Sequence, residues 1–536
     1  MSDEQKQRDV PTSAGEESPS DATVSERGAV VAALAPSSAR VGHDTLEQGG
    51  NAIDAAVAAA LCAAVVEPDS CGMAGYGAHL TIALANGQVT CIDANSAAPQ
   101  AARPDMFGVN AGGQVRGEAN YYGWLAAGIP GTLAGLQLAL DQYGTKKFGD
   151  VVVQAIRFAR DGFRVDERMA GRIAQFADHL KRDPTSKQIY FNGDRPLEVG
   201  DLCRNSELAS LLEQLAERGS VESFYRGDIG RQIAAEYQKY GGIATAEDFA
   251  AYEAKEVEPV VVEWGNNSIQ TAPLTAGGIS TLQALSILRA LDWKQLGDDH
   301  QKNHAVLEAL RLAWRDRLRY FGDPEHVDVP TGRLLSDGYA EQLAREVRQA
   351  VTERRPVEFQ LDSYEQIGTV HISAGDASGN LVALTLTHGR GFGACVTVKG
   401  TGLTLGHGVS RFDPRPGFAN SVGPGKRPLN NMAPTVVLRD GRPVLAVGGR
   451  GGRRILNALC STLLPFIASD QSMGQSIDAP RLHTEGGLTL MLDDLWRQED
   501  VAYFNKLGYE VTRAQIAHLS AVSFDHDRSR VRAALR

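Results

Sequence analysis

One segment restricts the fold more than any other: residues 49–68, "GGNAIDAAVAAALCAAVVEP", are almost all small and apolar. A Gly-Gly-Asn start and a proline stop mark the two ends of a helix, and the lack of a polar face predicts that this helix is buried on most sides. The apolar run is too short and too rich in alanine to span a membrane. We therefore expect an interior helix in a protein without a membrane span.

The hydrophobic pattern changes at Thr369. Before it, apolar residues recur at helical spacing, as in 208–215 and 307–321. After it, the segments 369–375 and 381–389 alternate between apolar and polar residues, which predicts two strands joined by a hairpin turn. Helices followed by strands favour a layered α+β architecture.

Composition excludes several classes of protein. The net charge of −11 over 536 residues leaves no basic face for nucleic acid. The six cysteines form no CxxC pairs and have no histidines at metal spacing, which predicts reduced thiols and no metal site. Residues 1–28 are polar and lack the apolar region of a secretory signal, so we expect a disordered tail and a cytoplasmic location.

Thr369 follows Gly368 at the head of the first predicted strand, and taken alone it is most simply a strand residue. Chemistry offers an alternative, because cutting the peptide bond before Thr369 would give this residue both a hydroxyl and a free α-amine. An α-amine has a pKa of about 7.7–8.0, so part of it is unprotonated at neutral pH and can act as the base for the hydroxyl. One residue would then replace a Ser-His-Asp set, for which the chain has no GxSxG motif.

Three features of the neighbouring sequence agree with this alternative. Thr387, on the paired strand, is placed to hydrogen-bond the Thr369 hydroxyl, and Gly368 leaves room for attack on the preceding carbonyl. Gly451 and Gly452 lie between a predicted strand and a predicted helix, where two backbone N–H groups can form an oxyanion hole. Their surroundings, "GGRGGRR", match neither a Walker loop nor a dinucleotide loop, so no nucleotide cofactor is expected.

Further landmarks follow one another along the chain: "GGNAIDAAVAAALCAAVVEP", "GIPGTLAGLQLALDQYG", "FYRGDIGRQIAAEYQKYGGIATAEDFAAYE", "GTVHISAGDASGNLVALTLT", "GPGKRPLNNMAPTVV" and "GGRGGRRI". Their order and spacing resemble those of the γ-glutamyltransferase family of N-terminal nucleophile hydrolases. The resemblance implies a four-layer αββα sandwich made as a self-cleaving precursor. A large subunit, residues 29–368, and a small subunit, residues 369–536, would form one intertwined domain. Pairing of two processed heterodimers into a homodimer is a further expectation.

The resemblance also implies roles for single residues. Thr369 matches the family's nucleophile, Thr387 the threonine that orients it, and Gly451-Gly452 the oxyanion pair. A looser match places Asn430 and Asn431 where the family has a substrate-contacting pair, usually serines. The family uses no metal or cofactor for this chemistry.

Two departures affect the substrate. Glutathione-type members hold the glutamyl α-carboxylate with an arginine in "DxRExAP", where this chain reads "DANSAAP" and has Asn95. They hold the α-amine with an acid before a phenylalanine, where this chain has Arg411. An ammonium beside a guanidinium costs about 4 kcal/mol at 4 Å with an effective dielectric constant of 20, whereas a carboxylate is attracted. The alternative for Arg411 is a simple ion pair with Asp413 on a loop.

These observations favour a self-processing, cofactor-free amidohydrolase whose acyl group carries a carboxylate but no α-amine, similar to the oxamate amidohydrolase type in this family. One alternative is a γ-glutamyltransferase or glutathione hydrolase with a rebuilt clamp. Another is an uncleaved, non-catalytic binding protein. Three histidines near the site have no ligand spacing and are expected to be structural; they are His371, His388 and His407.

Overall fold

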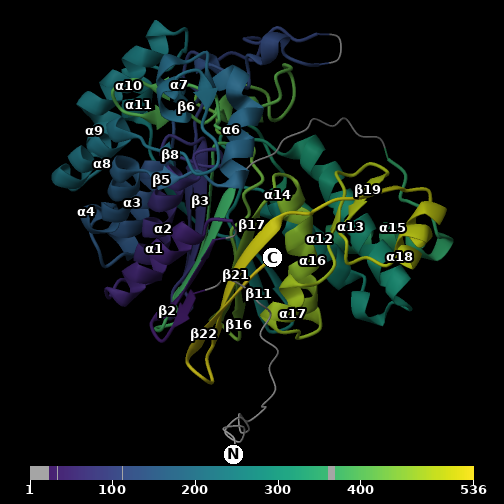
Figure 1. The fold of residues 1–536 in the computed structure, drawn as a ribbon. Helices are drawn as coiled ribbons and strands as arrows, with labels where there is room; N and C mark the ends of the chain where they lie inside the picture. Colours follow the sequence, from purple (N-terminus) through teal and green to yellow (C-terminus); the bar gives the residue numbers. More distant parts are fainter. Residues whose placement is uncertain (1–22, 33, 111–112, 360–368) are drawn as a thin grey trace, which may run out of the picture.

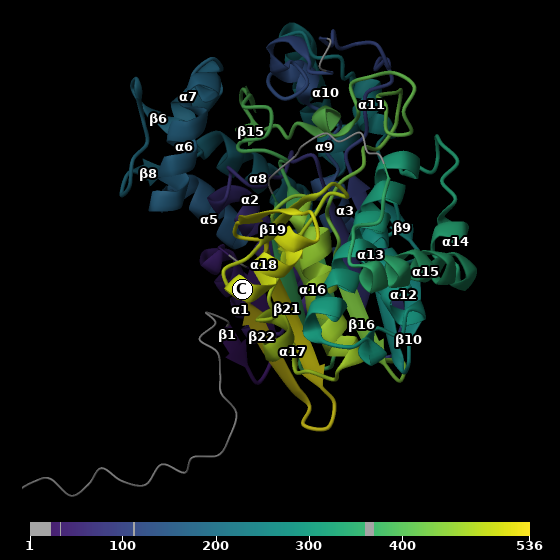
Figure 2. The ribbon, with the colours of Figure 1, turned by 90° about the vertical axis from the view of Figure 1, so that its right-hand side faces the viewer.

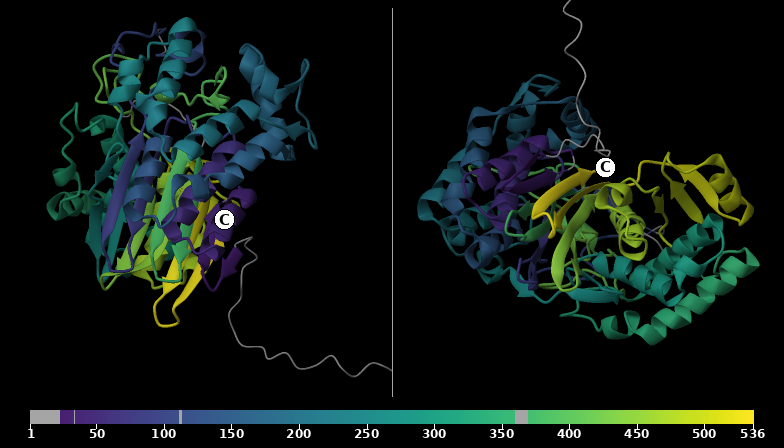
Figure 3. Two further views of the ribbon diagram at one scale, coloured as in Figure 1. Left: turned by 90° about the vertical axis from the view of Figure 1, so that its left-hand side faces the viewer. Right: turned by 90° about the horizontal axis from the view of Figure 1, so that it is seen from below.

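The computed structural model describes residues 23–32, 34–110, 113–359 and 369–536. Two antiparallel sheets lie face to face, and helices cover the outer face of each (Figure 1). In the view from below (Figure 3, right), the yellow strands lie between purple helices and teal to yellow-green helices. The predicted four-layer α+β sandwich is therefore confirmed.

The first sheet contains strands from both ends of the sequence. Its order is β1 (Thr23–Ser25), β2 (Gly28–Ala32), β12 (Val370–Asp376), β13 (Leu381–Thr387), β3 (Gly77–Ala83), β4 (Val89–Asn95) and β9 (Lys255–Val257). The predicted hairpin is β12–β13, with Val370 opposite Leu386 and Gly375 opposite Leu381. Strands that follow Thr369 in sequence thus occupy the middle of a sheet whose other strands all precede it.

The interior helix predicted from residues 49–68 is α2 (Ala52–Val66), and all of its residues are buried. The Asn51 side chain accepts hydrogen bonds from the N–H groups of Ile53 and Asp54, and Asp54 accepts one from Asn51 in return. This capping box fixes the start of the helix, and Pro68 follows its end. Small side chains let α2 lie close to β12 and β13 on the outer face of the first sheet.

Three helices pack around α2: α1 (Pro36–Glu47), α3 (Thr132–Tyr143) and α5 (Val153–Asp161). The helix α8 (Ser206–Arg218) packs on α5. Further out are α6 (Glu167–Leu180), α7 (Pro184–Tyr190), α9 (Glu222–Arg226), α10 (Asp228–Lys239) and α11 (Ala246–Ala251). In Figure 2, α6 and α7 project at the upper left, on the side opposite α13 and α15. No helix of the described residues is long and apolar enough to cross a membrane.

The second sheet is built from β10 (Val260–Trp264), β11 (Asn267–Thr271), β16 (Thr435–Arg439), β17 (Arg442–Arg450), β21 (His518–Asp525) and β22 (Arg530–Leu535). Its outer face is covered by α12 (Gly278–Ala290) and α16 (Arg454–Ala468), with α13 (Asp299–Tyr320) and α15 (Asp337–Glu353) packed on α12. α13 is the helix predicted from the stripe at 307–321. A separate apolar cluster, including Leu381, Ala383, Val436, Ala446 and Val522, fills the space between the two sheets.

One predicted boundary is wrong. The sequence predicts a disordered tail over residues 1–28, but residues 23–25 form β1 and Gly28 begins β2. The pairing of β1 with β2, and of β2 with β12, supplies the backbone hydrogen bonds that the polar composition of this segment did not reveal. Residues 1–22 and the predicted cleavage-site residue Gly368 lie outside the described residues.

Candidate active site

Thr369 lies at the head of β12 and is buried, with 4% of its surface exposed. Val370 pairs with Leu386, so continuing this register by one residue places Thr369 opposite Thr387. Thr387 is buried, and its hydroxyl oxygen accepts a hydrogen bond of 2.8 Å from the Gly389 N–H. A hydroxyl that accepts in this way can still donate its own proton, which is what orienting a neighbouring hydroxyl requires.

The glycine pair lies at the same end of the sandwich as Thr369. β12 packs on β17, and a Cβ atom added to Gly448 would meet the ring of His371. His371 is near the start of β12 and Gly448 near the end of β17, so the start of one strand meets the end of the other. Gly451 and Gly452 follow directly, between β17 and α16, as predicted.

The conformation of Gly451 explains why a glycine is needed there. Its φ angle is +141°, and an added Cβ atom would lie 2.8 Å from the Cα of Ala517. A side chain at this position would therefore clash with backbone and strain the turn. The turn leads into the first residues of α16, where backbone N–H groups point away from the helix and suit a developing oxyanion.

His371 is a buried structural residue. Its Nδ1 lies 2.7 Å from the Thr385 hydroxyl and its Nε2 lies 3.1 Å from the Ser373 hydroxyl. Burial lowers the pKa of His371 to about 3. The ring is therefore neutral at physiological pH, and it holds the two sheets together through Ser373, whose hydroxyl donates to the carbonyl of Ser520.

This burial predicts acid sensitivity. Between pH 6.5 and about 3 the unfolded chain takes up a proton at His371 that the folded chain does not. The free energy of unfolding should therefore fall by about 1.4 kcal/mol per pH unit in this range, apart from the contributions of other groups. Urea unfolding from pH 7 to pH 4 measures the slope, which should be smaller in His371→Asn; equal slopes for the two proteins would contradict this account.

A cavity of about 560 Å³ opens beside the glycine pair. Among the described residues, its wall carries six arginines and one aspartate, so positive side chains predominate. The charged residues are Arg315, Arg317, Arg319, Arg411, Asp413, Arg415 and Arg453. Such a wall favours an anionic ligand and disfavours a cationic one.

Arg411 lies on this wall, at the end of the short helix η4 (Gly408–Arg411), and only 4% of it is exposed. Its guanidinium lies over the ring of Tyr76, 5.3 Å from the ring centroid. Asp413, the partner in the alternative interpretation, accepts hydrogen bonds of 2.9 and 2.7 Å from Nε and Nη2 of Arg415. The buried position of Arg411 on the cavity wall fits the predicted binding of a substrate carboxylate better than it fits a simple ion pair with Asp413 on a loop.

The two asparagines have different environments. Asn431 lies on the cavity wall, and its Oδ1 accepts a hydrogen bond of 3.1 Å from Arg317 Nη2. Asn430 is buried, with its side-chain amide 2.9 Å from the Nε2 of His79 and its Oδ1 bonded to the Met432 N–H. Only Asn431 is therefore placed by the structure where a ligand in the cavity would touch it.

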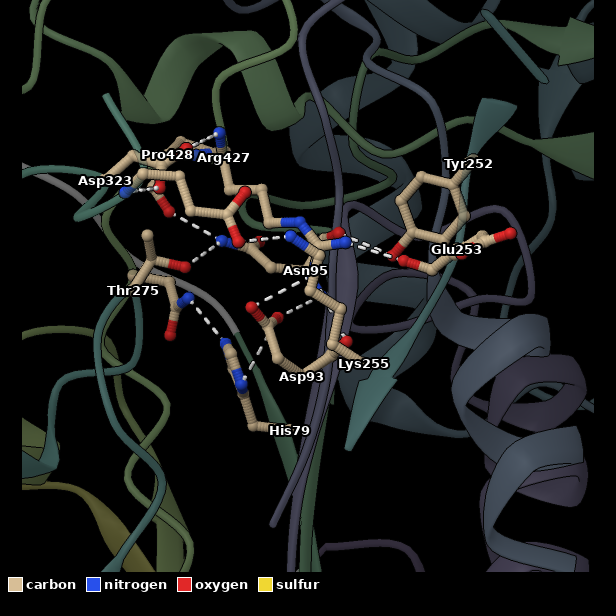
Figure 4. A network of polar contacts seen from close by, with 12 residues as sticks. His79, Asp93, Asn95, Tyr252, Glu253, Lys255, Thr275, Asp323, Arg427 and Pro428 are labelled. Atoms are coloured by element: carbon tan, nitrogen blue, oxygen red, sulfur yellow. Dashed lines mark hydrogen bonds and ion pairs between the residues drawn. The ribbon is translucent and has the colours of Figure 1, made fainter. Parts of the chain in front are cut away.

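Asn95 lies at the end of β4 within a network of polar contacts (Figure 4). It is not among the described residues that line the cavity. Its Nδ2 donates to the Thr275 hydroxyl and to the Pro428 carbonyl, both at 2.6 Å. Neighbouring Arg427 pairs with Asp93 at 2.9 Å. The asparagine thus ties β4 to the segment before Asn430, and its predicted role in substrate binding stays a prediction.

Of the six arginines on the described cavity wall, the sequence predicts only Arg411, and two of the others lie next to predicted site residues or core positions. Arg317 lies on α13, and Arg453 follows Gly452 directly. The signal for Arg317 was available, because it falls three residues after Trp314 on the apolar side of the helix predicted at 307–321. An arginine on a core-facing position needs a partner or a ligand.

An αββα sandwich with a threonine at the head of a central strand is the architecture of the N-terminal nucleophile hydrolases. The family model described as Gamma-glutamyltranspeptidase matches residues 38–535, and the chain belongs to this family. It is an enzyme of the N-terminal nucleophile amidohydrolase type.

Individual relatives point to two activities. The chain is 37% identical to a glutathione hydrolase proenzyme of Escherichia coli, over 85% of this chain and 80% of that protein. It is 32% identical to the Acylase ACY 1 proenzyme of a Pseudomonas species, over 92% and 89%. A crystal structure of a cephalosporin acylase from Bacillus halodurans superposes with a TM-score of 0.83 at 24% identity, covering 98% of both chains, which supports the fold.

Proposed function

We propose that this protein cuts itself before Thr369 and then hydrolyses an amide whose acyl group carries a carboxylate and no α-amine. The observation that carries the substrate class is the position of Arg411, buried on the wall of a cavity whose described residues include six arginines and one aspartate. The names of the relatives, which call them proenzymes, support a two-chain product from one precursor. A cytoplasmic location and a homodimer of processed heterodimers stay predictions.

The first reaction is self-cleavage. The Thr369 hydroxyl attacks the carbonyl of the preceding residue, the peptide nitrogen leaves as the α-amine of Thr369, and water hydrolyses the resulting ester. Burial of Thr369 and its position opposite Thr387 support this step. The products are the large subunit and a small subunit that begins at Thr369.

The second reaction uses the same hydroxyl on a substrate. The α-amine takes the proton of the Thr369 hydroxyl as the oxygen attacks the amide carbon, and returns it to the leaving amine. The N–H groups of Gly451 and Gly452 stabilise the oxyanion, and water then releases the acid from the acyl-enzyme. Arg411 binds the carboxylate of the acyl group and so places the amide against Thr369.

A pair of anilides tests the substrate class. Glutaryl p-nitroanilide and γ-glutamyl p-nitroanilide share one chain and differ only by an ammonium group. We expect kcat/KM of the processed enzyme to be about 100-fold higher for the glutaryl compound, because an ammonium near Arg411 is repelled. Release of p-nitroaniline measures both rates.

The main alternative is a glutathione hydrolase, which the 37% identity to such a protein favours. Faster turnover of the γ-glutamyl compound would support that alternative and overturn our proposal. An uncleaved protein with no turnover of either anilide would instead support a binding role.

A further inference from the structure

Arg317 is a buried arginine on the cavity wall that the proposed reaction does not use. Only 5% of its surface is exposed. Its Nη2 donates to the Asn430 carbonyl at 2.7 Å and to Asn431 Oδ1 at 3.1 Å, while Nη1 has no hydrogen-bond acceptor within the described part of the chain. A guanidinium normally uses both of its nitrogen edges, so this side chain has donor capacity left over on a ligand cavity.

The described residues leave the positive charge of Arg317 without a paired carboxylate. Arg453, which also lines the cavity, pairs with Glu485 at 2.5 Å, and His483 lies 3.4 Å from the same carboxylate. Among the described residues, Arg317 has no carboxylate within ion-pair distance. Burial, together with the charge of Arg453, lowers the pKa of Arg317 to about 9. A bound anion would remove this imbalance.

Arg317 and Arg411 line the same cavity from different elements. Arg317 comes from α13 and Arg411 from η4. Burial raises the pKa of the Tyr76 phenol, and both guanidiniums oppose this effect, Arg411 more than Arg317. Two guanidiniums on the wall of one cavity can each bind an anionic group of the same ligand.

We propose that Arg317 is a second anion-binding residue of this cavity and that the preferred acyl group carries two carboxylates, one bound by Arg411 and one by Arg317. This inference rests on the proposed function, since it assumes that the acyl group lies in this cavity. Two guanidiniums can distinguish an acyl group with two carboxylates from an acyl group with one, whereas a single guanidinium could not.

A third anilide tests the inference directly. The 4,4-dicarboxybutanoyl p-nitroanilide has the same chain as the glutaryl compound, with a second carboxylate in place of one hydrogen. We expect the processed wild-type enzyme to show a kcat/KM at least about 10-fold higher for this compound than for the glutaryl one, as one added charged hydrogen bond allows. A preference for the glutaryl compound would overturn the inference and leave the proposed function intact.

Variants separate recognition from structural support. Arg317→Met should reduce the ratio of the two kcat/KM values to about one, whereas Arg317→Lys, which keeps a charge near the Asn430 carbonyl, should retain part of it. Arg345→Met, which removes an arginine from the exposed side of α15, should leave the ratio unchanged. If Arg317→Met lowers both rates equally, the residue only supports the wall, and the inference is wrong. If the γ-glutamyl compound is the best of the three, the proposed function itself fails.

Discussion

The Thr369→Ala variant should run as one full-length band on a denaturing gel, whereas the wild-type protein gives two. Alanine has no hydroxyl to attack the preceding carbonyl, so the α-amine of residue 369 is never released. Both the nucleophile and its base are then missing, and anilide hydrolysis should fall by about 10⁴-fold or more. A gel and a p-nitroaniline assay on the same preparation measure the two effects together.

Thr369→Ser is the matched control, because serine keeps a hydroxyl at the same position and should still give two bands and measurable turnover. The circular dichroism spectrum of Thr369→Ala should resemble that of the wild type, since the change removes only one hydroxyl and one methyl group at the end of a strand. Two bands from Thr369→Ala would show that cleavage does not use this hydroxyl. Full activity in that variant would exclude Thr369 as the nucleophile.

Arg411→Asp should reverse the preference between the two simplest anilides. A carboxylate at this position repels the glutaryl carboxylate and attracts the ammonium of the γ-glutamyl compound. Each interaction is about 4 kcal/mol for unit charges 4 Å apart at an effective dielectric constant of 20, so the ratio of the two kcat/KM values should change by at least about 10³-fold. The measurement is the same p-nitroaniline assay on processed protein.

Two further variants at position 411 test whether the charge or the paired hydrogen bonds of Arg411 cause the preference. Arg411→Lys keeps the charge but loses the paired hydrogen bonds, so the preference should weaken without reversing. Arg411→Gln removes the charge and should bring the ratio close to one. Because Arg411 is buried, each variant should first be checked for the two bands that report a folded, processed protein. An unchanged ratio in processed Arg411→Asp would show that Arg411 does not face the acyl group.

Features governed by local sequence were predicted well. The apolar body of α2 and its capping residues are adjacent in sequence, and so are the two strands of the β12–β13 hairpin. The turn at Gly451 is also local, since it lies between β17 and α16. In each case the residues that form the structure are close together in the sequence, so the local pattern is enough to predict it.

The side-chain environments could not be predicted, because their partners are distant in sequence. The Asn430 amide contacts His79, which is 351 residues away, and the Asn95 amide contacts Thr275, which is 180 residues away. Asn95 and Asn430 were expected to contact substrate, and these contacts involve their side-chain nitrogens. Strand pairing with β12 likewise explains why residues 23–28 are ordered, although their composition is polar.

The order of the first sheet has a consequence for the cut protein. β12 and β13 lie between β2 and β3, so cleavage before Thr369 leaves the small subunit inserted in the middle of a sheet of the large subunit. Unfolding then changes from a unimolecular process into the separation of two polypeptides, and its midpoint depends on protein concentration. Once separated, neither polypeptide can rebuild the sheet alone. The peptide bond that the proposed cleavage breaks would therefore be needed while the sheet assembles, and dispensable only afterwards.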